Sequence, residues 1–128
     1  MRRSTLGAAG LMLAFSTAMQ GSAEAAIFVA RTNPTSYGYA EFDWNTGKLV
    51  AYDTATDGRR IIASAYISFT GQQLAYAEDS NGNNGSPGSP DYADPSDYQP
   101  GNEWITILVC RQEGTDTSTR DKCDSSDF

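Results

Sequence analysis

The chain has 128 residues, 39% of them hydrophobic, and its formal net charge at pH 7 is −7 because 16 acidic residues outnumber 9 basic ones. This acidic balance argues against a nucleic-acid partner and against electrostatic attachment to a membrane, since both present negative charge. The chain contains no histidine, which excludes histidine acid–base catalysis and the usual histidine metal sites.

The first 25 residues predict a secretory signal peptide. Arg2 and Arg3 precede an apolar run over Leu6–Met19, and Ala23-Glu24-Ala25 supplies the small residues that a signal peptidase cleaves. The run is shorter than the roughly 20 apolar residues of a membrane-spanning helix. We therefore expect a secreted, extracellular protein with one mature domain over residues 26–128 and no membrane anchor after cleavage.

Six segments of the mature chain have the composition of β-strands, and none predicts a helix. In Arg60–Thr70, apolar residues from Ile61 to Phe69 alternate with polar ones, which is typical of a half-buried strand. Glu103–Arg111 is apolar on both faces, which favours a central strand. The pattern predicts an all-β fold, namely a small antiparallel β-sandwich or open barrel of five to six strands. The six segments are Ala26–Thr32, Tyr39–Trp44, Lys48–Asp53, Arg60–Thr70, Gln73–Glu78 and Glu103–Arg111.

The connections between these segments carry turn signals. Asn45-Thr46-Gly47 predicts a hairpin, and Asp53 to Gly58 predicts a turn. Between the last two strands lies Asp79–Asn102, in which 20 of 24 residues are Asp, Ser, Asn, Gly or Pro. This composition predicts a long flexible loop without regular structure, which is either disordered or functional.

Two cysteines, Cys110 and Cys123, predict a disulfide, because an even count in an exported chain favours pairing. The bridge would tie down the polar segment from Arg111 to Lys122. A reactive thiol and a metal-ligand pair are the alternatives. Both are disfavoured, since the chain offers neither a histidine nor a redox C-x-x-C motif.

Carboxylates and tyrosines are the remaining candidates for a site. Asp53 and Asp57, which precedes Gly58, resemble part of a calcium loop, although the same residues are typical of a plain turn. Asp91, Asp94 and Asp97 recur every third residue in the long loop and could bind calcium weakly, or could be a solvated loop.

Tyr92 and Tyr98 lie in the same loop and could contact a protein or glycan partner, because tyrosine rings are amphipathic. Glu41 and Asp43 share one face of a predicted strand and could serve a glycoside hydrolase. Exposed acids on a half-buried strand are, however, the ordinary expectation, and no residue is assigned a catalytic role.

A short stretch of the chain resembles a pattern of small secreted bacterial domains of unknown function, written G-x-A-x-F, a turn with Gly, then D-x-x-x-D-G. The resemblance implies an exported all-β domain without an assigned activity. The Asp79–Asn102 insertion departs from the pattern. The matching residues are Gly38-Tyr39-Ala40-Glu41-Phe42, Gly47-Lys48-Leu49, Asp53 and Asp57-Gly58.

The sequence therefore favours a secreted, non-enzymatic β-domain that acts as a binding or surface-interaction module. Its partner would be an extracellular protein or glycan, and calcium is the one cofactor that the residues suggest. A small secreted carboxylate-dependent hydrolase is the alternative from another class. An exported protease inhibitor that presents Asp79–Asn102 is a third, disfavoured because inhibitory loops are usually short and rigid.

Overall fold

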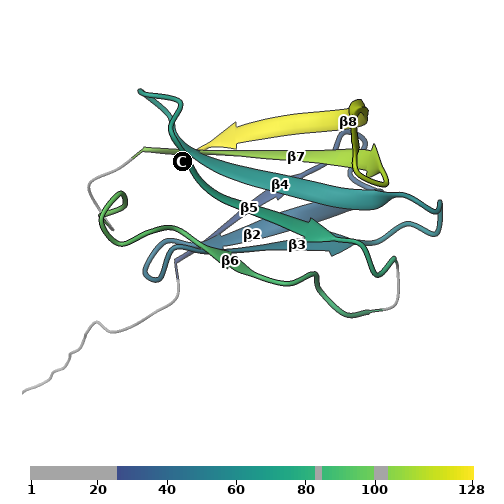
Figure 1. The fold of residues 1–128 in the computed structure, drawn as a ribbon, viewed down its shortest axis with the longest axis horizontal. Coiled ribbons are helices and arrows are strands. Elements are labelled where there is room, and N and C mark those ends of the chain that lie inside the picture. The colour runs from purple at the N-terminus through teal and green to yellow at the C-terminus, as the bar shows by residue number, and fades with distance from the viewer. Residues whose placement is uncertain (1–25, 83–84, 100–103) are drawn as a thin grey trace, which may run out of the picture.

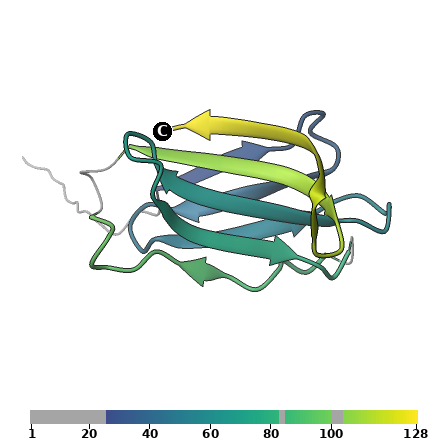
Figure 2. The ribbon, with the colours of Figure 1, turned by 45° about the horizontal axis from the view of Figure 1, so that its top comes forward.

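The chain folds as a sandwich of two antiparallel four-stranded sheets, shown from two directions in Figures 1 and 2. The computed structural model describes residues 26–82, 85–99 and 104–128, so the predicted signal peptide lies outside the described residues. The first sheet has the order β1-β2-β3-β6, and the second has the order β5-β4-β7-β8. The predicted antiparallel β-sandwich is confirmed. The strands are β1 (Ile27–Arg31), β2 (Gly38–Asp43), β3 (Lys48–Asp53), β4 (Arg60–Ile67), β5 (Gln73–Asp79), β6 (Asp91–Tyr92), β7 (Ile105–Glu113) and β8 (Asp116–Asp127).

The core lies between the two sheets and follows the two-residue period of the strands. Phe42 of β2 and Leu49 of β3 are fully buried from one sheet, and Ile61 of β4 and Ile107 of β7 are buried from the other. This alternation directs one side of β2 inward, which confirms its predicted face. In β4 the predicted face is buried from Ile61 to Ala65, but Ile62 and Ser64 on the opposite face are buried as well, so β4 is not the half-buried strand that was predicted. Among the described residues, no helix has the length and apolar character needed to cross a membrane.

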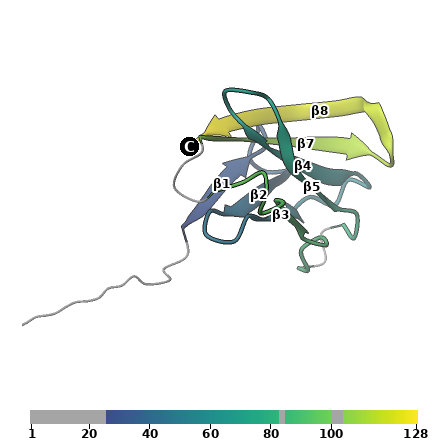
Figure 3. The same ribbon diagram turned by 60° about the vertical axis from the view of Figure 1, so that its left-hand side comes forward.

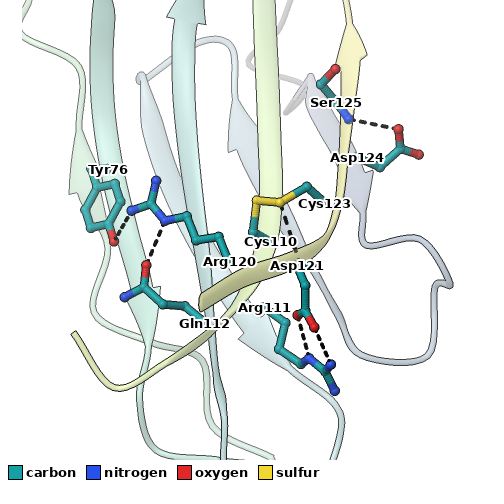
Figure 4. Close-up of a disulfide and its surroundings, with 9 residues drawn as sticks. All are labelled: Tyr76, Cys110, Arg111, Gln112, Arg120, Asp121, Cys123, Asp124 and Ser125. Atoms are coloured by element: carbon teal, nitrogen blue, oxygen red, sulfur yellow. Dashed lines mark hydrogen bonds and ion pairs between the residues drawn. A yellow bond between two sulfur atoms is a disulfide. The ribbon is translucent and has the colours of Figure 1, made fainter. Parts of the chain in front are cut away.

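The described residues form eight strands rather than five or six, and the longer of the two additional strands is β8. The segment Arg111–Lys122, predicted to be a polar loop, belongs to a hairpin in which β8 pairs with β7. A disulfide between Cys110 and Cys123 joins the two strands, which confirms the predicted bridge (Figure 4). The sequence did not predict β8 because it has almost no apolar residues. Its strand conformation comes from pairing with β7 and from the disulfide.

The described part of the predicted flexible loop is packed against the sandwich, which corrects the expectation of a segment without regular structure. We call residues 85–98 the strap. Its β6 pairs with β3, Ser89 forms a bridge to Glu78 of β5, and the N–H of Gly88 donates to the carbonyl of Ala51 at 3.0 Å. The strap therefore runs along an edge of both sheets on the same side of the molecule. Its polar backbone groups are satisfied by those edges, which compensates for its low apolar content.

Candidate functional site

The two ends of the sandwich differ in chemistry. Within the described residues, four large hydrophobic side chains are exposed, and all belong to one end, which we call the aromatic end. This end is formed by the start of β1, the β2–β3 and β4–β5 turns, β6 and the start of β7, at the left of Figure 1 and brought forward in Figure 3. The four residues are Ile27, Phe69, Tyr92 and Trp104.

Phe69 and Trp104 form a pair at this end, with ring centroids 6.5 Å apart in an edge-to-face arrangement. Phe69 lies in the β4–β5 turn, which is closed by a 2.8 Å hydrogen bond from the N–H of Gly71 to the carbonyl of Ile67. The N–H of Ser68 donates to the carbonyl of Trp104 at 2.8 Å and holds the two segments together. Phe69 is 82% exposed and Trp104 61% exposed, so the backbone fixes two aromatic rings in solvent.

A chain of polar side chains lies beside the aromatic pair. The hydroxyl of Thr106 donates to Oδ1 of Asp127 at 2.7 Å, and the Ser68 and Thr106 hydroxyl oxygens are 2.7 Å apart. Because the single hydroxyl hydrogen of Thr106 is used toward Asp127, Ser68 is the donor in the second bond. The site thus combines two exposed rings with two hydroxyls and a carboxylate, all held by backbone or side-chain contacts.

The opposite end carries an arginine–carboxylate network. Arg111 donates to both oxygens of Asp121 at 2.8 and 2.6 Å and to Asp57 at 3.2 Å, and its guanidinium lies 4.3 Å from the centroid of the Tyr37 ring. The hydrogen bonds from Arg111 hold the pKa of Asp121 below its ordinary value. Asp57 also accepts the N–H of Arg59, as in a turn. A fixed cation, Arg111, therefore already faces the Asp57 carboxylate.

Asp53, the other residue of that predicted calcium pair, is buried between the sheets and is only 6% exposed. Its Oδ1 accepts the N–H of Ala55 at 2.9 Å, and its Oδ2 has no hydrogen-bond partner within the described residues. Burial raises the pKa of Asp53, and the nearby Asp57 and Asp79 carboxylates raise it further. The structure therefore places Asp53 beside Asp79, a residue that the sequence did not single out.

The three aspartates of the strap have separate local roles. Asp91 accepts the N–H of Tyr76 at 2.9 Å, while Asp94 accepts both the N–H and the hydroxyl of Ser96. Those two bonds lower the pKa of Asp94. The backbone N–H of Asp97 donates to the Asp94 carbonyl. No three Asp, Glu, Cys or His side chains gather as a metal-binding group in the described ranges, so calcium binding stays a prediction without a site that the geometry favours.

The two strap tyrosines differ sharply. Tyr92 is 55% exposed and belongs to the aromatic end, in agreement with a contact role. Tyr98 is 4% exposed, its hydroxyl donates to the Trp44 carbonyl at 2.6 Å, and its ring packs edge-on against Phe42. The expectation that Tyr98 contacts a partner is therefore corrected, because its ring fills the gap between the strap and the core.

Glu41 and Asp43 project from the outer face of β2 into a shallow hollow of about 140 Å³, shared with Ile27, Lys48, Val50 and Tyr52. The Tyr52 hydroxyl donates to Glu41 at 2.9 Å, and the N–H of Asn45 donates to Asp43 at 2.9 Å. Burial and the bonded Glu41 raise the pKa of Tyr52 to about 12. The two acids stand side by side on one strand, whereas glycoside hydrolysis needs acids on either side of a bond.

Sequence reasoning placed Phe69 and Trp104 within strands and missed them as site residues. Strand β4 is shorter than predicted and ends at Ile67, and β7 is shifted by two residues and begins at Ile105. The sequence signal that could have placed Phe69 in a turn is Gly71. A glycine with positive φ closes a turn, and the residues just before it belong to that turn and not to the strand. Gly71 has φ of 72°.

Comparison of the chain with protein-family models, curated proteins and solved structures gives no match. The class that the fold defines is an antiparallel β-sandwich, and what it does must be argued from its own surface.

Proposed function

We propose that this chain is a non-enzymatic, secreted binding module, and that the Phe69–Trp104 pair holds an uncharged extracellular glycan. The observation that carries the proposal is the exposure of two large aromatic side chains, 82% and 61%, on a turn and a strand end that a backbone hydrogen bond joins. Exposed apolar surface is unfavourable in water at roughly 25 cal/mol per Å². Rings held in place for contact are a common feature of binding sites, because little conformational freedom is lost when a partner covers them.

A glycan fits the chemistry beside the rings. A pyranose has an apolar C–H face that can lie on an aromatic ring, and its edge carries hydroxyls that need hydrogen-bond partners. Ser68, Thr106 and Asp127 form the adjacent polar chain, and an ionised carboxylate makes stronger hydrogen bonds than a neutral group. Together they offer both kinds of contact within one surface.

Charge selects among glycans. The protein has a net charge of −7, and Asp127 is the charged member of the hydrogen-bonded row Ser68–Thr106–Asp127. Anionic polysaccharides would be repelled by this field, so the expected ligand is neutral. The predicted signal peptide supports an extracellular encounter, because it would deliver the domain to the place where such polymers occur.

The hydrolase alternative has weaker support. Glu41 and Asp43 are each engaged by a local donor, and they lie on the same face of one strand. The inhibitor alternative required the segment Asp79–Asn102 to be free for presentation, whereas its described strap pairs with β3 and β5. A binding module is the function that the geometry favours.

The test is a depletion assay with insoluble neutral polysaccharides of several classes, namely glucans, mannans, xylans and galactans. The double variant Phe69→Ser/Trp104→Ser is expected to lose at least tenfold in affinity. Tyr92→Ser is the matched control, since Tyr92 is exposed at the same end but is not part of the pair, and it should bind as the wild type does. If the wild-type protein binds none of these polymers and captures a medium protein through the same two rings, the partner is a protein and the glycan proposal fails.

A further inference from the structure

Strand β1 has an open edge. The carbonyl of Ala26 accepts a hydrogen bond at 2.9 Å from the N–H of Trp44, just after β2, and the N–H of Thr32 donates at 3.0 Å to the carbonyl of Gly38, the first residue of β2. In an antiparallel pair, bonding alternates along the strand, so even-numbered residues of β1 bond toward β2. The backbone groups of Ile27, Val29 and Arg31 therefore point away from β2, and no described strand pairs with them. The open edge ends there, because the next outward N–H, that of Asn33, donates to the carbonyl of Lys122 in β8 at 3.0 Å.

The other edges of the sandwich are protected. The β5 edge is capped where the Asp91 carboxylate accepts the N–H of Tyr76, and the strap covers β3. Strand β8 is interrupted by two register shifts opposite β7, has Lys122 at a φ of 54°, and carries several aspartates. Bulges and charges of this kind prevent edge-to-edge pairing. Strand β1 has no bulge, proline or carboxylate in its sequence IFVAR, and its single charge is that of Arg31 at the end of the strand.

We propose that β1 pairs antiparallel with β1 of a second copy of this chain, centred on Val29, so that the β1–β2–β3 sheets of two molecules become one continuous sheet. In this register Val29 faces Val29 of the second copy, and Ile27 faces Arg31 of the second copy. All three outward-pointing residues of each β1 then find hydrogen-bonding partners. Any other antiparallel register leaves some of them unpaired.

Charge complementarity is the reason for choosing a second copy rather than an unrelated strand. Arg31 forms no ion pair with a carboxylate of the described residues, and its guanidinium lies 5.1 Å from the centroid of the Tyr39 ring. Across the proposed interface it stands opposite Ile27 of the second copy, which borders the hollow lined by Glu41 and Asp43. The long arginine side chain can then reach the row of Ile27 and Asp43, which pair in register across β1 and β2.

The same contact accounts for an exposed apolar side chain. Ile27 is 42% exposed and is the aliphatic member of the aromatic end. The methylene stem of Arg31 from the second copy would cover it, while the charged head remains at the hollow, where Glu41 and Asp43 outnumber Lys48. The two-fold symmetry repeats the contact, so each molecule provides one arginine and one hollow.

The experiment is sedimentation velocity on the protein as recovered from an exporting host, over a concentration series up to about 1 mM. Val29→Pro is the main variant. The N–H that proline removes points to the open edge, so pairing of β1 with β2 is retained, and proline is tolerated on an edge strand. Arg31→Glu tests the charge contact, and Arg31→Glu/Asp43→Lys restores it with reversed sign. Thermal melts check that each variant is folded.

The expected result is a concentration-dependent dimer in the wild type. Val29→Pro and Arg31→Glu should each weaken it by at least tenfold, and the charge-reversed double variant should recover most of the loss. A wild-type protein that stays monomeric throughout the series overturns the proposal. So does a dimer that is unchanged in both folded single variants, because its interface must then lie elsewhere. The outcome is independent of glycan binding, which uses Phe69 and Trp104.

Discussion

The backbone N–H of Asp53 donates to a carboxylate oxygen of Asp79 at 2.8 Å, so that two acidic residues meet inside the sandwich. Asp53 ends β3 of one sheet, and Asp79 ends β5 of the other. The second oxygen of Asp79 accepts the N–H of Asn81 at 3.1 Å. Asp79 thus satisfies backbone donors at the ends of both sheets, which explains how a fully buried carboxyl group is retained.

We expect this pair to make stability depend on pH. Burial raises the pKa of Asp53 above the ordinary 3.8. A carboxyl group whose pKa is higher in the folded than in the unfolded state stabilises the fold fully below the unfolded value. That contribution is lost as the pH rises through the folded value. The melting temperature should therefore fall as the pH is raised from about 4 through the elevated pKa of Asp53.

Replacement of Asp53 by asparagine removes this titration. The Asp53→Asn variant should gain about 1 kcal/mol in unfolding free energy at pH 7 and show a flatter pH dependence. Melting curves of both proteins from pH 4 to 8 measure the effect, with the exposed Asp97→Asn as the matched control. A variant that is less stable than the wild type at pH 7 would contradict the conclusion that burial disfavours the charged form of Asp53.

Gly88 is the closest point between the strap and β5. A Cβ at this position would overlap the carbonyl oxygen of Glu78 and lie 2.7 Å from the Cα of Asp79, both of which are backbone atoms. Gly88→Ala must therefore push the strap away, and we expect a loss of roughly 2–4 kcal/mol in chemical denaturation. Ser89→Ala changes the neighbouring exposed residue and should cost less than about 0.5 kcal/mol. Equal stabilities of the two variants would mean that the strap does not pack as described.

The strap tyrosines provide a second matched pair. Tyr98→Phe removes a hydroxyl that donates to the Trp44 carbonyl at 2.6 Å in a buried site, and should cost about 1 kcal/mol. Tyr92→Phe removes a hydroxyl from a ring that is 55% exposed, and should be neutral. Urea unfolding of the two variants compares them directly. A larger loss of unfolding free energy for Tyr92→Phe than for Tyr98→Phe would contradict the finding that Tyr98 is buried and Tyr92 is exposed.

The Cys110–Cys123 disulfide should matter most for the β7–β8 hairpin. The cysteines are 13 positions apart, and in the chain-entropy model closing a loop of this size stabilises the fold by about 3 kcal/mol. Arg120 reaches from the same hairpin to Gln112 at 2.7 Å and to the Tyr76 hydroxyl at 3.3 Å, as Figure 4 shows. The contact with Gln112 lies within the hairpin, whereas Tyr76 belongs to β5 of the same sheet.

We therefore expect Cys110→Ser/Cys123→Ser to lower the unfolding free energy by about 2–4 kcal/mol and to increase amide exchange in β8 before the other strands. Hydrogen-exchange mass spectrometry resolves the strands. Uniformly increased exchange across both sheets would indicate that the bridge stabilises the whole sandwich rather than its edge.

The apolar pattern was sufficient to predict β1 to β5 and β7, because each of these strands buries apolar side chains, at every second position in β2 and on both faces in the middle of β4. It could not predict β8, whose residues Asp116–Asp127 adopt a strand through pairing and a disulfide. It also could not predict that the strap would seal two sheet edges, since that depends on backbone hydrogen bonds and on Tyr98 rather than on composition. The aromatic pair was missed for a related reason: apolar periodicity does not mark where a strand ends.

Trp104 itself can report on the central proposal that the aromatic pair binds a neutral glycan. The chain has two tryptophans, and the indole N–H of Trp44 is buried without a partner in the described residues, so Trp44→Phe loses no hydrogen bond. In this variant the emission comes from Trp104 alone. Titration with soluble neutral glucans, mannans and xylans should shift or quench that emission for at least one polymer, and Phe69→Ser should weaken the response. Unchanged Trp104 emission in the presence of a polymer that the protein demonstrably binds would place the binding surface elsewhere and contradict the account.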